Sequence, residues 1–185
     1  MLDEAIQLIH SHPDFRFSPD GYWCVEEFLA GRSQAERDRF LQMVREKKIL
    51  IPAQEGSLLT GFASLEALIR SLYSAFEFSQ KYGGPFDYAN ITDVPSYSWS
   101  YASILAGAGL KYFVAGSDND NGPILLYSRL NEKSPFWWEG PDGARIMMWY
   151  SRTSLPAAGG HGGGVEQAIR LSENAVLRLY RGDGP

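Results

Sequence analysis

Apolar residues recur at intervals of three and four in several parts of the chain, the spacing that predicts amphipathic helices. The clearest pattern begins after Ser64, a suitable N-cap, and predicts one continuous helix that ends at Gly83-Gly84-Pro85. Its apolar face consists of Leu65, Leu68, Ile69, Leu72 and Phe76. Similar patterns predict helices over residues 2–11, 20–30 and 98–108, and another behind the capping pair Ser33 and Glu36.

Short apolar or alternating runs lie between these helices. They predict strands over residues 14–17, 49–51, 87–92 and 111–114. A chain in which strands alternate with helices builds a parallel sheet with crossover helices. The expected fold class is therefore α/β, with mostly parallel strands.

The pattern changes in the last third of the chain. Two strand-like runs over residues 136–139 and 145–150 flank Gly140-Pro141-Asp142-Gly143, which predicts a β-hairpin near residues 135–150. Weaker signals predict a strand over 124–127, a glycine-rich loop over 157–164, a helix over 165–174 and a last strand over 175–180. Because no stretch has the composition of a linker, residues 1–185 are expected to form a single domain.

Composition excludes several classes of protein. Of 185 residues, 44% are hydrophobic and 14% aromatic, too many for a disordered chain, and a net charge of −5 gives no basic footprint for nucleic acid. No apolar run approaches the roughly 18–20 residues of a membrane helix. The single cysteine, Cys24, excludes an internal disulfide. The first residues lack the pattern of a secretory signal, so a cytoplasmic location is expected.

Ligands of parallel α/β sheets bind at the carboxyl ends of the strands. Loops over residues 54–57, 92–99 and 116–121 occupy such positions, and each contains a carboxylate. In the second loop Asp93 is followed by aromatic residues, a combination that suits carbohydrate chemistry, in which carboxylates act on sugars stacked on aromatic rings. The alternative is that Asp93 caps the helix beginning near Ser98, or holds its turn.

The residues around Asp93 also carry a family resemblance. The stretches 90–99 and 104–113 resemble the amino-terminal catalytic domain of glycoside hydrolase family 38, the α-mannosidases and their bacterial relatives. Residues 12–17, 59–72 and 135–143 resemble further segments of that domain, so the likeness covers roughly residues 1–150. Its most specific parts are Asp93-Val94-Pro95 and the stretch from Trp137 to Gly143.

The resemblance implies a seven-stranded β/α-barrel-like domain and a retaining mechanism with two carboxylates roughly 5 Å apart. It assigns Asp93 to the active site. The family's nucleophile falls near Leu59 or Thr60, where Glu55 is the closest acid, so Glu55 is the second catalytic candidate. The candidate sugar platforms are Tyr97, Trp99 and Trp138. Family members bind a divalent metal, usually zinc, but its His-x-Asp pair has no match here, and no metal ligand is assigned.

The expected function is thus glycoside hydrolysis of the α-mannosidase type, in which O-glycosyl bonds are cleaved with retention. The alternative is a non-catalytic carbohydrate-binding or structural domain that kept the fold. We expect the chain to be a piece of the catalytic domain without its first strand, an incomplete barrel whose exposed sheet edge invites self-association. A carbohydrate is the expected partner, with no nucleic acid and no membrane.

Overall fold

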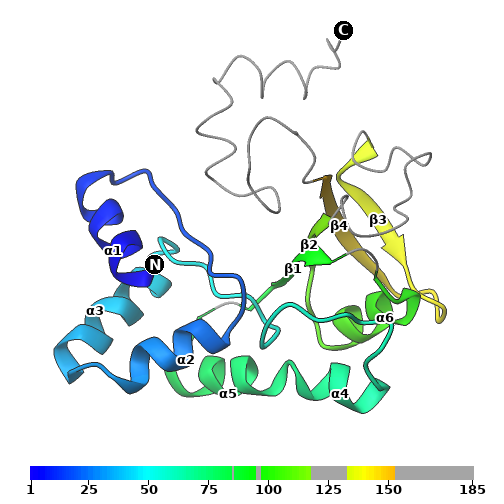
Figure 1. The fold of residues 1–185 in the computed structure, drawn as a ribbon, viewed down its shortest axis with the longest axis horizontal. Coiled ribbons are helices and arrows are strands. Elements are labelled where there is room, and N and C mark those ends of the chain that lie inside the picture. Colours follow the sequence, from blue (N-terminus) through cyan, green and yellow to red (C-terminus); the bar gives the residue numbers. More distant parts are fainter. Residues whose placement is uncertain (85, 95–96, 118–132, 153–185) are drawn as a thin grey trace, which may run out of the picture.

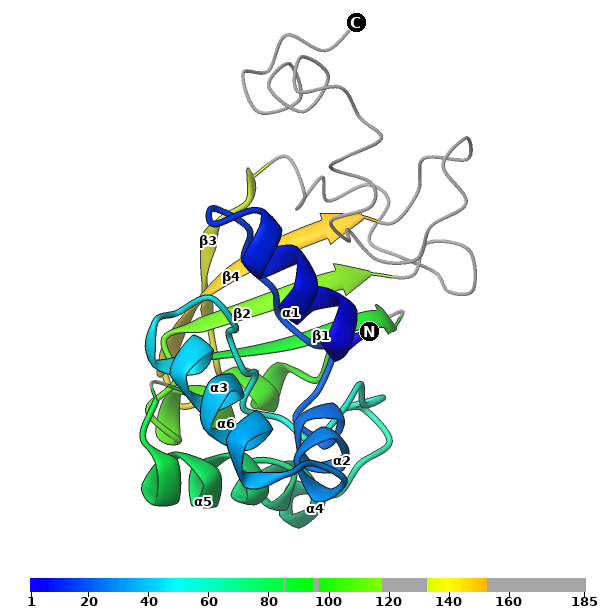
Figure 2. The same ribbon diagram turned by 90° about the vertical axis from the view of Figure 1, so that its left-hand side faces the viewer.

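The computed structural model describes residues 1–84, 86–94, 97–117 and 133–152 (Figure 1). Its centre is a four-stranded sheet with the spatial order β1-β2-β4-β3. The strands are β1 (Tyr88–Val94), β2 (Tyr112–Ser117), β3 (Phe136–Glu139) and β4 (Arg145–Arg152). β1, β2 and β4 are parallel and point the same way in Figure 2, whereas β3 pairs with β4 as an antiparallel hairpin. The predicted hairpin and mostly parallel sheet are confirmed.

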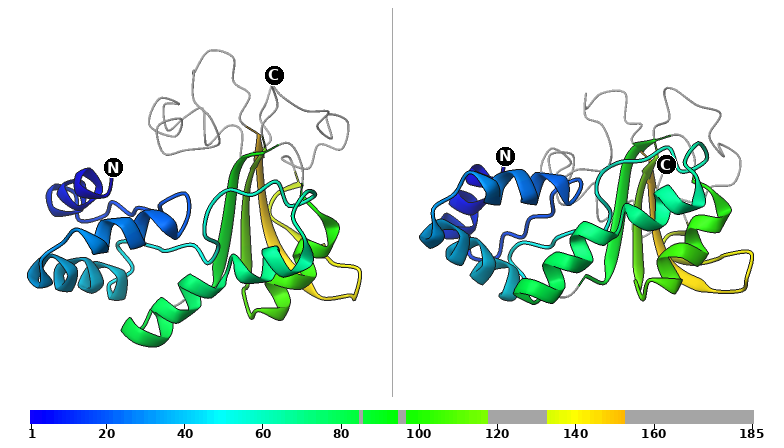
Figure 3. Two further views of the ribbon diagram at one scale, coloured as in Figure 1. Left: turned by 60° about the horizontal axis from the view of Figure 1, so that its bottom comes forward. Right: turned by 90° about the horizontal axis from the view of Figure 1, so that it is seen from below.

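Six helices surround the sheet within the described residues. They are α1 (Leu2–Ser11), α2 (Trp23–Ala30), α3 (Gln34–Arg45), α4 (Leu65–Arg70), α5 (Tyr73–Tyr82) and α6 (Trp99–Gly107). Figure 3 shows α1, α2 and α3 together on one side of the sheet, and α6 on the other, next to the β3–β4 hairpin that ends the sheet. One apolar core lies among α1, α2, α3 and α5, and the second joins the sheet to α4 and α6.

Two extended segments continue the parallel arrangement beyond β1. Phe17 and Ile49 form a parallel bridge, and the Leu50 amide donates to the Phe17 carbonyl oxygen at 2.8 Å. The Ala53 amide donates to the carbonyl oxygen of Tyr88 in β1 at 2.9 Å. The strands expected over residues 14–17 and 49–51 are therefore reduced to one bridge. The segments nevertheless run side by side with β1 in chain order.

The helix predicted after Ser64 is interrupted. α4 ends at Arg70 and α5 begins at Tyr73. The carbonyl oxygen of Ser71 accepts a hydrogen bond from the amide of Glu55 at 2.8 Å, and the Ser71 hydroxyl donates to the Leu68 carbonyl oxygen at 2.7 Å. These bonds explain the break, because a carbonyl taken by a distant loop no longer receives the helical amide that would continue the ladder.

The helix predicted over residues 20–30 begins late, at Trp23. Gly21 has a φ of 144°, and the amides of Tyr22 and Trp23 donate to the carbonyl oxygens of Gln54 and Glu55. The contact with the 54–57 loop delays the helix. By contrast, the capping box of α3 is confirmed, because the Glu36 carboxylate accepts from the Ser33 amide at 2.9 Å.

Several predictions lie outside the described residues. They are the strands over 124–127 and 175–180, the loop over 157–164, the helix over 165–174 and most of the loop over 116–121. Among the helices that the structure does describe, none has the length and apolar character needed to cross a membrane.

Candidate functional site

Polar side chains from three segments meet where the extended segments end. Asp20 follows the bridge residue Phe17, Ser57 follows the 49–53 segment, and Asn90 and Thr92 belong to β1. Oδ1 of Asp20 accepts hydrogen bonds from Thr92 Oγ1 at 2.8 Å and from Asn90 Nδ2 at 3.1 Å. Oδ2 of Asp20 accepts a longer one from Ser57 Oγ at 3.5 Å. The carboxylate of Asp20 thereby links the three segments at the carboxyl ends of the parallel strands.

The buried side chain of Gln54 also fixes Asn90. Its Nε2 donates to Asn90 Oδ1 at 3.0 Å, and its Oε1 accepts from the Asn90 main-chain amide at 3.0 Å. Gln54 is completely inaccessible to solvent, so these bonds replace those that it would make with water. Because the side-chain oxygen of Asn90 accepts from Gln54, the side-chain nitrogen of Asn90 points toward Asp20.

Asp93 lies in a β-bulge at the end of β1. Thr92 pairs with Gly116 and Val94 with Ser117, so Asp93 is the extra residue between two consecutive pairs. Its φ is 59°, in the left-handed region that costs side-chain-bearing residues energy, although Asp and Asn tolerate it better than most. Bulges redirect side chains and are common beside active sites. Asp93 is exposed here, and the N-cap position of α6 is held by Ser98, not by Asp93.

The electrostatics of the site centre on Asp20. Partial burial raises the pKa of the Asp20 carboxyl above its ordinary value of 3.8, while the hydrogen bonds from Thr92 and Ser57 lower it in part. The nearby charge of Asp93 adds to the increase. Although the Asp20 side chain reaches the surface, its carboxylate is crowded by neighbouring atoms, and this crowding is the origin of the desolvation. Asp20 consequently holds its proton to a higher pH than an ordinary aspartate.

Glu55, the second predicted carboxylate, lies in the same group of loops. Its amide donates to the Ser71 carbonyl oxygen at 2.8 Å, and its carbonyl oxygen accepts from the Trp23 amide at 3.0 Å. A Cβ on Gly21 would lie 2.7 Å from that carbonyl oxygen, so the close approach requires glycine. The main chain of Glu55 is held on both sides, and the side chain is partly exposed.

Each of the three predicted aromatic platforms contacts a strand of the sheet. Tyr97 donates to the Ile91 carbonyl oxygen at 3.3 Å and packs edge-on against Phe113. Trp99 is 61% exposed, and its Nε1 donates to the Glu139 carbonyl oxygen at 2.7 Å.

Trp138 stacks on Phe113 and pairs with Ile146 at the amino-terminal end of β4. That position is level with the start of β1, whereas Asp93 lies at its other end, about 16 Å further along at about 3.3 Å per residue. The structure therefore places Trp138 and Asp93 at opposite ends of the strands.

Sequence reasoning missed Asp20. It was included in the predicted helix over residues 20–30, whereas the structure places it before α2, in the turn that follows the Phe17 bridge. The sequence nevertheless contains a signal that identifies Asp20 as a candidate. The rule that selected the loops after the other strands also selects the residues after the predicted strand 14–17.

The described residues do not fit a zinc site. They contain no group of three or more His, Cys, Asp and Glu side chains able to hold a metal ion. His10 and His12 lie at the end of α1, where their Nδ1 atoms are hydrogen-bonded to the Ile6 carbonyl oxygen and the Ser11 hydroxyl.

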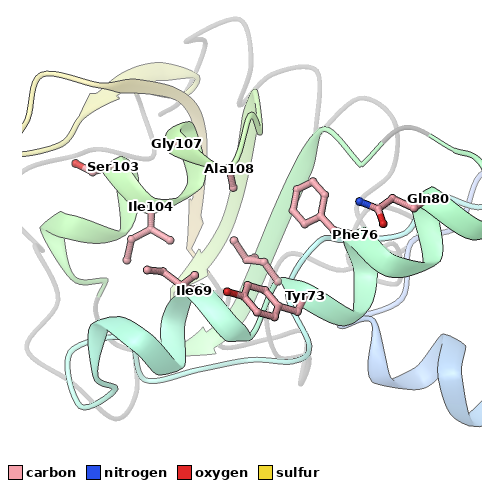
Figure 4. Close-up of a pocket in the computed structure, with 9 residues that line it drawn as sticks. Ile69, Tyr73, Phe76, Gln80, Ser103, Ile104, Gly107 and Ala108 are labelled. Atoms are coloured by element: carbon pink, nitrogen blue, oxygen red, sulfur yellow. The ribbon is translucent and has the colours of Figure 1, made fainter.

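A separate pocket of about 530 Å³ lies between α4, α5 and α6 (Figure 4). Its lining is mainly apolar, with Ile69, Phe76 and Ile104 pointing toward the space between the helices. Among the described residues that line it, none carries an ionisable carboxylate, amine or imidazole. The pocket thus lacks acid–base groups such as Asp20, Glu55 and Asp93, which lie at the carboxyl ends of the strands and in the loops that follow them.

The fold resembles those of known carbohydrate-active enzymes. A protein in the glycosyl hydrolase family 38 from Enterococcus faecalis superimposes with a TM-score of 0.65 at 20% identity, over 97% of this chain and 19% of that one. An alpha-mannosidase from Enterococcus faecalis V583 gives a TM-score of 0.62 at 22% identity, over 80% and 16%. A 4-alpha-glucanotransferase from Thermococcus litoralis gives 0.66 at 11% identity, over 96% and 27%.

These likenesses establish a glycosidase-like fold. The chain spans between 16% and 27% of the length of the three structures. No protein-family model matches the sequence, and no curated protein matches it.

Proposed function

We propose that the chain is a carbohydrate-processing domain of the α-mannosidase type, which hydrolyses O-glycosyl bonds with retention. The observation that carries the proposal is the placement of Asp93, an exposed carboxylate on a bulge at the carboxyl end of a parallel strand. Ligands of parallel sheets bind at this edge. The glycosidase-like fold supports the same chemistry.

Retaining hydrolysis requires two carboxyl groups, one ionised to attack the anomeric carbon and one protonated to assist the leaving oxygen. Asp93 and Glu55 are the proposed pair. Asp93 is held by the bulge, and Glu55 by main-chain hydrogen bonds to α2 and to the α4–α5 junction. Of the predicted sugar platforms, Trp99 has the most exposed ring and is the one proposed for this site, whereas Tyr97 packs on Phe113 and Trp138 lies at the far end of the strands from Asp93.

The parallel segments are proposed to be part of a larger β/α barrel of seven strands. The bridge at Phe17 and Ile49, followed by β1, β2 and β4, gives a parallel series that supports this arrangement. Within the described residues the outer side of the 14–17 segment has no strand paired to it, and we propose that it is available to another strand of a longer protein or to a second copy.

The test is hydrolysis of a panel of p-nitrophenyl glycosides, α-D-mannopyranoside included, with and without added zinc. Asp93→Asn should lower the rate by about 10²–10⁴-fold, the usual contribution of a positioned acid or base. Asp14→Asn removes another exposed carboxylate, which has no contact with the polar side chains around Asp20 and should leave the rate unchanged. Full activity in Asp93→Asn would show that the site is wrongly assigned.

A second candidate function is carbohydrate binding without turnover. The site presents two carboxylates beside the hydroxyls of Ser57 and Thr92 and the amide of Asn90, a set of groups suited to sugar hydroxyls. Calorimetric titration with methyl α-D-mannopyranoside distinguishes the two functions. Binding without any glycoside hydrolysis supports this candidate, and hydrolysis that Asp93→Asn abolishes excludes it.

A further inference from the structure

We infer that Asp20 is the positioning residue for Asp93: by accepting hydrogen bonds from Asn90 and Thr92, it holds the end of β1 in the bulged form that presents the Asp93 carboxylate. The role of Asp20 in a reaction rests on the proposed function. The structural part of the inference does not, because the contacts exist without substrate.

The geometry carries the inference. Asn90 and Thr92 are two residues apart on a strand, so their side chains lie on one face. Both donate to the same oxygen of Asp20, at 3.1 and 2.8 Å. The Thr92 main-chain amide also donates to Ser57 Oγ at 3.4 Å. The last regular residue before the bulge is thus fixed through both its side chain and its main chain.

A local structural role does not account for Asp20. The residue precedes α2, but the N-cap position of that helix is Tyr22, and the Asp20 side chain is bonded to β1 and to the 54–57 loop instead. Among the described residues, the titratable groups near Asp20 are Asp93 from β1 and Cys24 from α2, and its hydrogen-bond donors are Ser57, Asn90 and Thr92. A partly desolvated carboxylate beside another carboxylate opposes folding, and such unfavourable features are retained mainly at functional sites.

The first experiment requires no ligand. Two-dimensional ¹H–¹⁵N NMR spectra of the intact protein are compared for the wild type, Asp20→Ala, Asp20→Asn and the control Asp14→Asn. Asp20→Ala should shift the amide resonances of Asp93 and Val94. Asp20→Asn should largely restore them, because its carbonyl oxygen can still accept from Thr92 and Asn90. The control should leave both resonances in place.

If Asp20→Ala does not fold, Thr92→Val provides the same test, because it removes the donor while keeping the shape of the side chain. Unchanged Asp93 and Val94 resonances in a folded Asp20→Ala or Thr92→Val variant would overturn the inference, whatever the protein hydrolyses.

The second experiment measures the consequence for catalysis with p-nitrophenyl α-D-mannopyranoside. Asp20→Ala should lower kcat by about 10–100-fold with a smaller change in KM, because a misplaced catalytic group loses rate more than binding. Asp20→Asn should recover part of the loss. Shifted amides with no hydrolysis by the wild type would refute the proposed function and leave the positioning role standing. Equal kcat in all variants despite shifted amides would refute the catalytic part of the inference.

Discussion

The hydroxyl of Thr92 donates a hydrogen bond to Oδ1 of Asp20 across 2.8 Å, and the two residues are 72 positions apart in the chain. The bond joins the turn after the first extended segment to the bulged end of β1. It also places the Asp20 carboxylate near that of Asp93, with consequences for stability as well as for chemistry.

Replacing Asp20 should remove a contribution that lowers the stability of the folded protein as pH rises. The pKa of Asp20 is raised above 3.8 in the folded state, so the native protein binds more protons than the unfolded chain between 3.8 and that raised value. The contribution of Asp20 to the stability of the folded protein therefore falls as pH rises through this window. The melting temperature of Asp20→Asn minus that of the wild type should therefore increase as pH rises from below 3.8 to neutrality.

Thermal scans across this pH range measure the effect, with Asp14→Asn as the control for the loss of one exposed carboxylate. A difference between Asp20→Asn and the wild type that is constant with pH, or that matches the control, would contradict the prediction.

The pKa of Asp20 should respond to its two neighbours in opposite directions. Thr92→Val removes a hydrogen bond that stabilises the charged carboxylate, so the pKa of Asp20 should rise further. Asp93→Asn removes a nearby negative charge, so the pKa of Asp20 should fall. Carboxyl ¹³C NMR titration measures both shifts, and a change of the same sign in the two variants would show that the cluster is not arranged as described.

The left-handed backbone of Asp93 predicts an unusual order of stabilities. Asp93→Gly should be at least as stable as the wild type, because glycine adopts a φ of 59° without strain. Asp93→Val should lose about 1–2 kcal/mol, because a β-branched residue is poorly tolerated there. Urea unfolding measures both. Lys47, with a φ of 57°, is the matched position away from the site, and Lys47→Gly should stabilise the fold without affecting any hydrolysis.

Gln54 should prove important for the fold despite its polarity. Gln54→Leu leaves the main-chain amide and the side chain of Asn90 without their partner in a buried place, a loss of about 1–3 kcal/mol. Gln7→Leu, on the exposed surface of α1, should change stability by less than about 0.5 kcal/mol. Equal effects in urea unfolding would mean that the Gln54–Asn90 pair contributes little.

The β3–β4 turn should tolerate no side chain at Gly140. An added Cβ would lie 2.8 Å from the main-chain nitrogen of Ser103 in α6, and the loss should be about 1–3 kcal/mol. The matched variant is Gly107→Ala at the end of α6, where nothing lies within 4 Å of an added Cβ. It should gain up to about 1 kcal/mol from helix propensity. Thermal unfolding that gives both variants the same sign would contradict the packing of the turn on α6.

Local signals predicted the elements that depend on local physics. α1 and α3 were identified by apolar spacing and by a capping pair, and the hairpin by four turn-forming residues between two strand-like runs. The placement of Asp93 at a strand end also follows from the alternation of strands and helices. These features require information from only a few neighbouring residues.

The remaining errors come from contacts between distant segments. The helix after Ser64 is broken because Glu55 captures the carbonyl of Ser71, and α2 starts late because Tyr22 and Trp23 bond the 54–55 main chain. Neither acceptor can be recognised from the sequence near the helix concerned. Asp20 was assigned to a helix for the same reason.

By itself, the sequence determined the α/β class, the order of β1, β2 and the hairpin, and one carboxylate at a strand end, since hydrophobic spacing and turn residues act over short distances. Tertiary structure decided which polar side chains meet. Asp20, Gln54 and Asn90 form one hydrogen-bonded cluster because parallel segments bring their carboxyl ends to one edge. The bulge that gives Asp93 its left-handed backbone is likewise a property of strand register, which pairing between distant residues sets.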